Sequence, residues 1–149
     1  MKRLIILITA IVLPCIVVSA QDTALHSIDD IFNGKVVPRR EMKRTSVQGD
    51  RLAGLRLSEF VSVQFQADKN RLSLISSIIE NSVLTATAKE TETEGAYLTY
   101  AFITLQPTEE DLNQYLGYSA KHQGEKYWIT VIYFCGATSA SELKDKLSK

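Results

Sequence analysis

Three glutamates, Glu90, Glu92 and Glu94, are the most regular set of chemically active side chains in this sequence. They alternate along a predicted strand, so their carboxylates project to one face and could hold a cation or act as an acid/base pair. A catalytic pair needs burial to separate its two pKa values, and residues 85–94 contain no large apolar side chain to bury them. We therefore expect a solvated face, with a carboxylate-based, hydrolase-like enzyme as the alternative.

Nucleophiles and metal ligands are few and far apart. After residue 20 the chain contains one cysteine, Cys135, and two histidines, His26 and His122, none at metal-ligand spacing. The sequence predicts a hairpin of strands 113–121 and 126–135, in which His122 lies by the turn and Cys135 at the far end. At about 3.3 Å per residue the two are more than about 20 Å apart. We expect a buried, inert Cys135, and we assign no catalytic residue, metal site or cofactor.

The segment 35–44 is the strongest local concentration of positive charge. Arg39, Arg40, Lys43 and Arg44 form a candidate patch for an anionic partner, such as a membrane surface, lipopolysaccharide or an acidic protein. The alternative is a solvated loop, because residues 35–50 have few large apolar side chains and lack the periodicity of an amphipathic helix. We predict that this whole stretch is a loop.

Aromatic side chains are frequent in the predicted strands of the second half of the chain. Some must face outward, where they could form a binding surface, although aromatic residues favour sheets in any case. The set comprises Tyr97, Tyr100, Tyr115, Tyr118, Tyr127, Trp128 and Tyr133.

The elements that position these residues follow from apolar periodicity. Residues 55–65 alternate as a strand, a helix with an apolar stripe begins after Asp68 or Asn70, and residues 85–94 form an exposed strand at or near a sheet edge. The strand 96–105 follows a turn at Glu94-Gly95 and forms a hairpin with 85–94. A second hairpin joins strands at 113–121 and 126–135, the last apolar on both faces and therefore central. Short helices are predicted at 23–33 and after the capping box that starts at Ser139, in which the Glu142 carboxylate can reach back to the Ser139 backbone. This order predicts an α+β fold: a mainly antiparallel sheet of about five strands with helices packed on one face.

The N-terminus has the pattern of a cleavable secretory signal peptide. Lys2 and Arg3 precede the uncharged run 4–18, and Val18-Ser19-Ala20 supplies small residues for cleavage. We expect a signal peptide at 1–20 and a single mature domain at 21–149, with no membrane span after cleavage. The alternatives are a buried N-terminal helix or a retained anchor, and a lipoprotein modified at Cys15.

Charge argues against one class of partner. Removing Lys2 and Arg3 from 17 basic residues leaves 15 against 17 acidic residues, a net charge of −2. A dedicated nucleic-acid binder needs a basic excess, so we expect no nucleic-acid partner.

Several stretches together resemble a known kind of protein. These are the signal ending in Ala-Gln, the strand 97–100 (Tyr-Leu-Thr-Tyr), the strand 129–136 (Ile-Thr-Val-Ile-Tyr-Phe-Cys-Gly) and the closing helix from Ser139. The layout resembles small secreted domains of unknown function from Bacteroides-type Gram-negative bacteria. The resemblance implies a place in the cell envelope and brings no activity. We therefore expect a non-enzymatic periplasmic or secreted binding or accessory module, for which another envelope protein is a candidate partner. A secreted effector or inhibitor is a further alternative.

Overall fold

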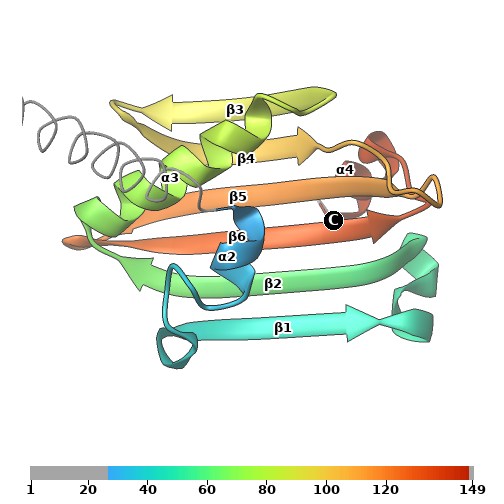
Figure 1. The fold of residues 1–149 in the computed structure, drawn as a ribbon, viewed down its shortest axis with the longest axis horizontal. Helices are drawn as coiled ribbons and strands as arrows, with labels where there is room; N and C mark the ends of the chain where they lie inside the picture. Colours follow the sequence, from blue (N-terminus) through green and yellow to red (C-terminus); the bar gives the residue numbers. More distant parts are fainter. Residues whose placement is uncertain (1–26, 148–149) are drawn as a thin grey trace, which may run out of the picture.

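The protein is an α+β protein built on one six-stranded antiparallel sheet, seen face-on in Figure 1. The computed structural model describes residues 27–147, so the predicted signal peptide at 1–20 lies outside the described residues. The strands lie in the order β1-β2-β6-β5-β4-β3. They span Met42–Gln48 (β1), Leu57–Ala67 (β2), Ala88–Glu94 (β3), Tyr97–Thr104 (β4), Asn113–Gln123 (β5) and Lys126–Gly136 (β6). The α-helices span Ile28–Phe32 (α2), Lys69–Val83 (α3) and Ala140–Leu147 (α4), with short 3-10 turns at Arg39–Glu41 (η1) and Gly49–Leu55 (η2).

The larger core fills the space between one face of the sheet and the helices α2 and α3, which lie on that face in Figure 1. The alternating residues of β2 supply its floor, as the sequence predicts, because every second side chain of a strand shares a face. The apolar stripe of α3 closes it from above. Fully or almost fully buried members are Val63, Phe65, Leu72, Ile75, Ile79, Ile103, Leu116, Ile129 and Val131. The Asp68 carboxylate accepts a hydrogen bond from the Arg71 amide at 2.8 Å, which confirms the predicted N-cap of this helix.

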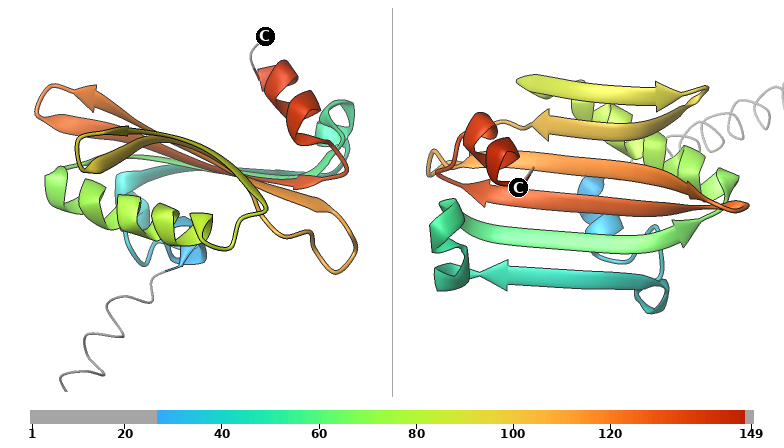
Figure 2. Two further views of the ribbon diagram at one scale, coloured as in Figure 1. Left: turned by 90° about the horizontal axis from the view of Figure 1, so that it is seen from above. Right: turned by 180° about the vertical axis from the view of Figure 1, so that it is seen from behind.

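The prediction that all helices pack on one face is wrong. Figure 2 shows α4 on the opposite face of the sheet from α2 and α3. There Leu143 is fully buried in a second, smaller apolar cluster with Phe102, Tyr115 and Phe134. The physical reason is the composition of β6, which is apolar on both faces and therefore needs a cover on each side. The prediction that β6 is central holds, because it pairs with β2 and β5.

The strand count is six rather than about five, because residues 42–48 form the edge strand β1 where a loop was predicted. This segment reads MKRTSVQ and its side chains are mostly exposed. Because little packs on either face of this edge strand, its sequence lacks the apolar alternation by which a strand is predicted. β1 forms instead by pairing with β2, from Met42 opposite Phe65 to Gln48 opposite Glu59.

The other sheet edge agrees with the sequence. β3 is exposed along its entire length and pairs with β4 alone, in the predicted hairpin that turns at Gly95. The predicted helix at 23–33 is shorter in the described part of the chain, where α2 occupies only Ile28–Phe32. Among residues 27–147, no helix has the length and apolar composition needed to cross a membrane.

Candidate functional site

An apolar groove lies on the back of the sheet, beside α4. It has a volume of about 450 Å³ and runs over β4, β5 and β6. Its side-chain lining is dominated by Tyr100, Phe102, Ile132 and Phe134 from the sheet and Leu147 from α4, with Ser119 and Thr130 toward the middle of the strands. Figure 2 shows from behind that α4 covers only one end of this face. We call this site the Gly117 groove, after the glycine in its lining.

Gly117 opens the floor of the groove. It lies in the middle of β5, opposite Phe102 on one side and Ile132 on the other. A Cβ at this position would meet its nearest neighbours, the Phe134 ring and the Ile132 Cβ, at 3.8 and 3.9 Å. Neither crowding nor a left-handed backbone therefore requires glycine here. A glycine inside a strand costs stability and often marks a bulge, a bend or a place where another group approaches closely, which makes Gly117 a candidate contact position.

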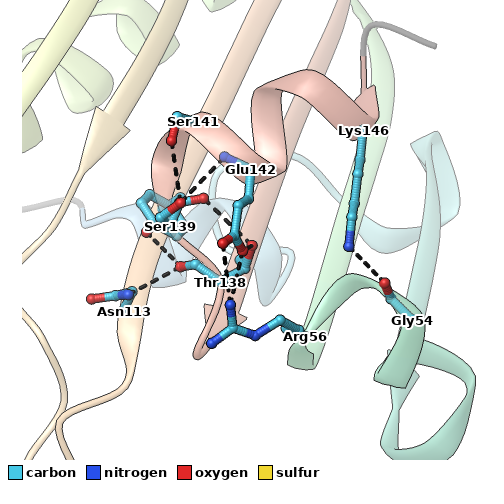
Figure 3. Close-up of polar contacts among 9 residues, drawn as sticks. Gly54, Arg56, Asn113, Thr138, Ser139, Ser141, Glu142 and Lys146 are labelled. Carbon is cyan, nitrogen blue, oxygen red and sulfur yellow. Dashed lines mark hydrogen bonds and ion pairs between the residues drawn. The ribbon is translucent and has the colours of Figure 1, made fainter.

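The helix α4 forms the wall of the groove and is anchored by more than Leu143. Figure 3 shows the Arg56 guanidinium reaching the Glu142 carboxylate, with Nη1 at 3.2 and 3.0 Å from the two oxygens. The Thr138 hydroxyl donates to the same carboxylate at 3.3 Å. The Ser139 hydroxyl accepts from the Glu142 amide as the predicted capping box requires. The Glu142 carboxylate, predicted to accept from the Ser139 backbone amide, instead accepts from the guanidinium of Arg56, which comes from a distant part of the chain.

The backbone before α4 is fixed in the same place. The Thr138 carbonyl accepts hydrogen bonds from the Tyr115 hydroxyl at 2.8 Å and from the Asn113 amide at 3.0 Å. Burial, and after it the Glu142 carboxylate, raise the pKa of Tyr115 above its ordinary value. The Lys146 ammonium donates to the Gly54 carbonyl at 2.7 Å near the end of the helix (Figure 3). These bonds hold α4 over the sheet and keep the groove open beside it.

Gly136 makes the turn into α4 possible. A Cβ at this residue would lie 2.5 Å from the Arg56 carbonyl oxygen and 2.6 Å from the Leu57 Cα, which are backbone atoms that cannot move aside cheaply. The same Arg56 carbonyl accepts from the amides of Ala137 and Thr138, and Arg56 itself has a left-handed φ of 56°. Close backbone contact thus connects the end of β6 to the start of β2.

One ion pair lies at the rim of the groove. The Lys144 ammonium binds the Glu90 carboxylate of β3 and lies 4.8 Å from the centroid of the Phe102 ring. This contact bridges α4 and the edge hairpin across the groove. Both side chains are partly exposed, so the pair positions the helix more than it stabilises the fold.

A second hollow continues along the same two strands. It has a volume of about 380 Å³ and is lined by Gln66, Lys121, His122, Gln123 and Trp128. Trp128 pairs with Lys121 in the register of β5 and β6, and each lies two residues beyond a residue that lines the groove. The two hollows therefore lie in line on one face, since residues two apart on a strand point the same way.

The predicted basic patch is divided by the structure. Lys43 and Arg44 are consecutive in β1, so their side chains leave on opposite faces of the sheet. Arg44 lines a hollow of about 410 Å³ beside α2, together with Asp29 and Glu59. The Arg39 Nε donates to the Asn33 carbonyl at 3.3 Å, and Arg40 is exposed in η1. Binding of an anionic partner by this patch stays a prediction.

The predicted carboxylate set forms no buried pair within the described residues. Glu90, Glu92 and Glu94 are all exposed, and Glu90 is bound by Lys144. Cys135 is buried, as predicted. It lies at the end of β6 away from His122, which pairs with Tyr127 beside the turn, so the expected separation of the two is confirmed. Among residues 27–147, no three His, Cys, Asp or Glu side chains gather as a metal-binding group.

The outward-facing aromatic side chains are fewer than the strand pattern allows. Tyr115 and Tyr118 are buried, whereas Tyr100 is 36% exposed at the groove and Trp128 is half-buried at the second hollow. Sequence reasoning missed the groove, because its lining comes from three strands and a helix on an unexpected face. Its one sequence signal is Gly117, an isolated glycine between Leu116 and Tyr118 in a strand pattern.

Fold and site together define a small α+β protein with an apolar groove, the Gly117 groove, on the face of the antiparallel sheet that carries α4. Residues 13–147 match the family of unknown function DUF6108, and the chain belongs to this family. No curated protein and no solved structure was found to be similar to it.

Proposed function

We propose that this protein is a non-catalytic binding module of the cell envelope, exported through its N-terminal signal, and that the Gly117 groove binds the apolar part of its ligand. The observation that carries the proposal is Gly117 itself, a glycine that leaves the floor of an apolar groove open although a larger side chain would fit. A volume of about 450 Å³ is within the range of small-molecule sites, which are mostly apolar with a few polar groups.

The chemistry of the groove supports binding rather than turnover. Its side chains are aromatic, aliphatic and hydroxyl groups, and its one charged member, Lys144, is bound by Glu90. General acid or base catalysis needs a titratable group within hydrogen-bond reach of a reacting atom. The described lining offers an apolar surface of defined shape, which favours recognition of an apolar ligand.

The groove can be tested by filling it. N-phenyl-1-naphthylamine is a neutral fluorophore that brightens in apolar sites, and we expect the mature protein to bind it. Gly117→Leu places a branched side chain in the groove and is expected to weaken binding at least tenfold. Ser46→Leu is the matched control, because Ser46 is an exposed strand residue that pairs with Val61, on the opposite face of the sheet from the groove. Equal affinity of the two variants, or no binding by the parent protein, would refute the proposal.

Export is tested separately. Expression of the full chain in a Gram-negative host should yield a periplasmic or secreted product whose N-terminus, read by mass spectrometry, is Gln21. A lipidated N-terminus at Cys15 or an uncleaved chain would contradict the proposed processing. Cross-linking of the mature protein in its native envelope tests for a partner protein, and recovery mainly from the medium would favour a secreted effector or inhibitor.

A further inference from the structure

We propose that the ligand is a single-chain anionic amphiphile of the long-chain carboxylate class, with its chain in the Gly117 groove and its carboxylate beside Lys121. This inference rests on the proposed function, because it names what the groove binds and in which direction the ligand lies. It is drawn from the order of apolar and charged side chains along β5 and β6.

The two hollows on the back of the sheet follow one another along these strands, since Lys121 and Trp128 of the second lie two residues beyond Ser119 and Thr130 of the first. The end next to α4 is lined by Phe102, Ile132 and Phe134, and the middle by the hydroxyl residues Ser119 and Thr130. The far end is the hollow with Trp128 and Lys121. Apart from Lys144, whose charge is bound by Glu90 at the rim, polarity increases from the α4 end toward Trp128 and Lys121, which matches a ligand with one apolar end and one polar end.

The spacing suits a chain and not a compact ligand. Gly117 and Lys121 are four residues apart on β5 and point to the same face. A strand rises about 3.3 Å per residue, so the floor of the groove and the Lys121 backbone are separated by about 13 Å. The ligand must be extended to contact both.

The charges around the second hollow favour an anion at the polar end, whereas the carboxylates of β3 on this face, Glu90 and Glu92, lie beside the groove instead. In the described lining of the second hollow, the charged or titratable residues are Lys121 and His122, with no carboxylate among them. Lys43, a member of the predicted basic patch, points to the same face and pairs with Gln64, which in turn pairs with Thr130. Glu125 in the adjoining turn is followed directly by Lys126, so the turn adds no net negative charge. The ammonium of Lys121 is exposed and can bind a carboxylate directly.

Trp128 reports on the direction of the bound chain. It is the only tryptophan of the protein, and it lines the second hollow opposite Lys121. Bromine quenches indole fluorescence at near contact. We therefore expect 2-bromododecanoate, with bromine next to its carboxylate, to quench Trp128 strongly on binding, and 12-bromododecanoate, with bromine at the chain end, to quench it at most half as much. Equal quenching, or stronger quenching by the 12-bromo compound, would overturn the assigned direction.

The anionic group is tested by comparing dodecanoate with dodecanol. Displacement of N-phenyl-1-naphthylamine measures both affinities, and we expect dodecanoate to bind at least fivefold more tightly. Lys121→Gln should remove this preference without changing dodecanol binding. Lys89→Gln is the matched control, because Lys89 is also an exposed strand lysine but pairs with Ile103, on the face of the sheet covered by α3.

The outcomes separate this inference from the proposed function. If dodecanoate and dodecanol bind equally and Gly117→Leu weakens both, the groove binds apolar ligands and the anionic assignment is wrong. If Gly117→Leu changes neither affinity, the groove assignment is wrong as well. A preference for dodecanoate that Lys121→Gln leaves intact would place the anionic group elsewhere and overturn the inference.

Discussion

Replacing Gly117 by alanine should stabilise this protein. At a tightly packed glycine the same replacement would destabilise the fold. The added methyl group would lie 3.8 Å from the Phe134 ring and 3.9 Å from the Ile132 Cβ, both ordinary van der Waals contacts. Gly117 also has no left-handed φ that alanine would strain. A methyl group at this position therefore causes no steric clash in the folded state.

The magnitude follows from the unfolded chain. Glycine within a strand is less favourable than alanine by about 0.5–1 kcal/mol, because it loses more backbone freedom on folding. The methyl group also buries apolar area against Phe134, which acts in the same direction. We expect a gain of about 0.5–1 kcal/mol in the free energy of unfolding, or about 2–4 °C in Tm for a domain of this size.

Urea and thermal unfolding followed by circular dichroism measure this difference. Gly136→Ala is the matched control, because the same methyl group would there lie 2.5 Å from the Arg56 carbonyl oxygen. Overpacking of this kind costs about 1–3 kcal/mol, so the two glycines should respond with opposite signs. A loss of more than about 0.5 kcal/mol in Gly117→Ala would show that Gly117 serves the fold, and it would remove the main support for a ligand groove.

Two further predictions concern the anchor of α4 and the larger core. A double-mutant cycle on Arg56→Ala and Glu142→Ala should give a coupling free energy of only about 0.2–1 kcal/mol, because the two side chains are 55% and 44% exposed. The coupling should fall in 1 M salt, which screens exposed charges. A coupling above about 2 kcal/mol would contradict this. Burial raises the pKa of Tyr118 to about 12, with a further rise from Glu80 and an opposing effect of Ser76. The Tyr118 proton is thus held more tightly in the folded state than in the unfolded chain. The resulting stabilisation of the folded state, about 2–3 kcal/mol, is complete below pH 10 and is lost as the pH rises through 12. Tyr118→Phe should be at least as stable as the parent protein at pH 7, since the buried Tyr118 hydroxyl has no hydrogen-bond partner among the described residues. The variant should also lose less stability than the parent between pH 10 and 12. Identical alkaline unfolding of both proteins would refute the raised pKa of Tyr118.

Much of the fold could be predicted from the sequence because local patterns and final burial agree. The alternation of Val61, Val63 and Phe65 defines the inner face of β2, and the Asp68 cap defines the start of α3. The charged run of β3 predicts an exposed edge, and the apolar run of β6 predicts the centre of the sheet. Each of these features is determined within about 15 residues, so a single segment carries the information.

The candidate site could not be predicted in the same way, because its parts come from separate segments. Gly117 and Lys121 gain meaning only when β5 lies beside β6, where Ile132 and Trp128 complete the lining of the two hollows. The carboxylate of Glu142 was expected at the Ser139 cap and is bound by Arg56, which lies 86 residues earlier in the chain. Nothing within α4 specifies that partner.

By itself, then, the sequence determined the N-terminal export pattern as a prediction, the α+β class, the central and acidic-edge strands and the burial of Cys135. Only the tertiary structure decided that Met42–Gln48 is a strand, that α4 covers the opposite face and that Gly117 lies at the floor of a groove. The physical reason is that periodicity reports whether a segment has an apolar side, but not which neighbour covers it. A strand that is apolar on both sides, such as β6, requires a cover on each face, and the close approach at Gly136 together with the Arg56 anchor determines where α4 provides the second one.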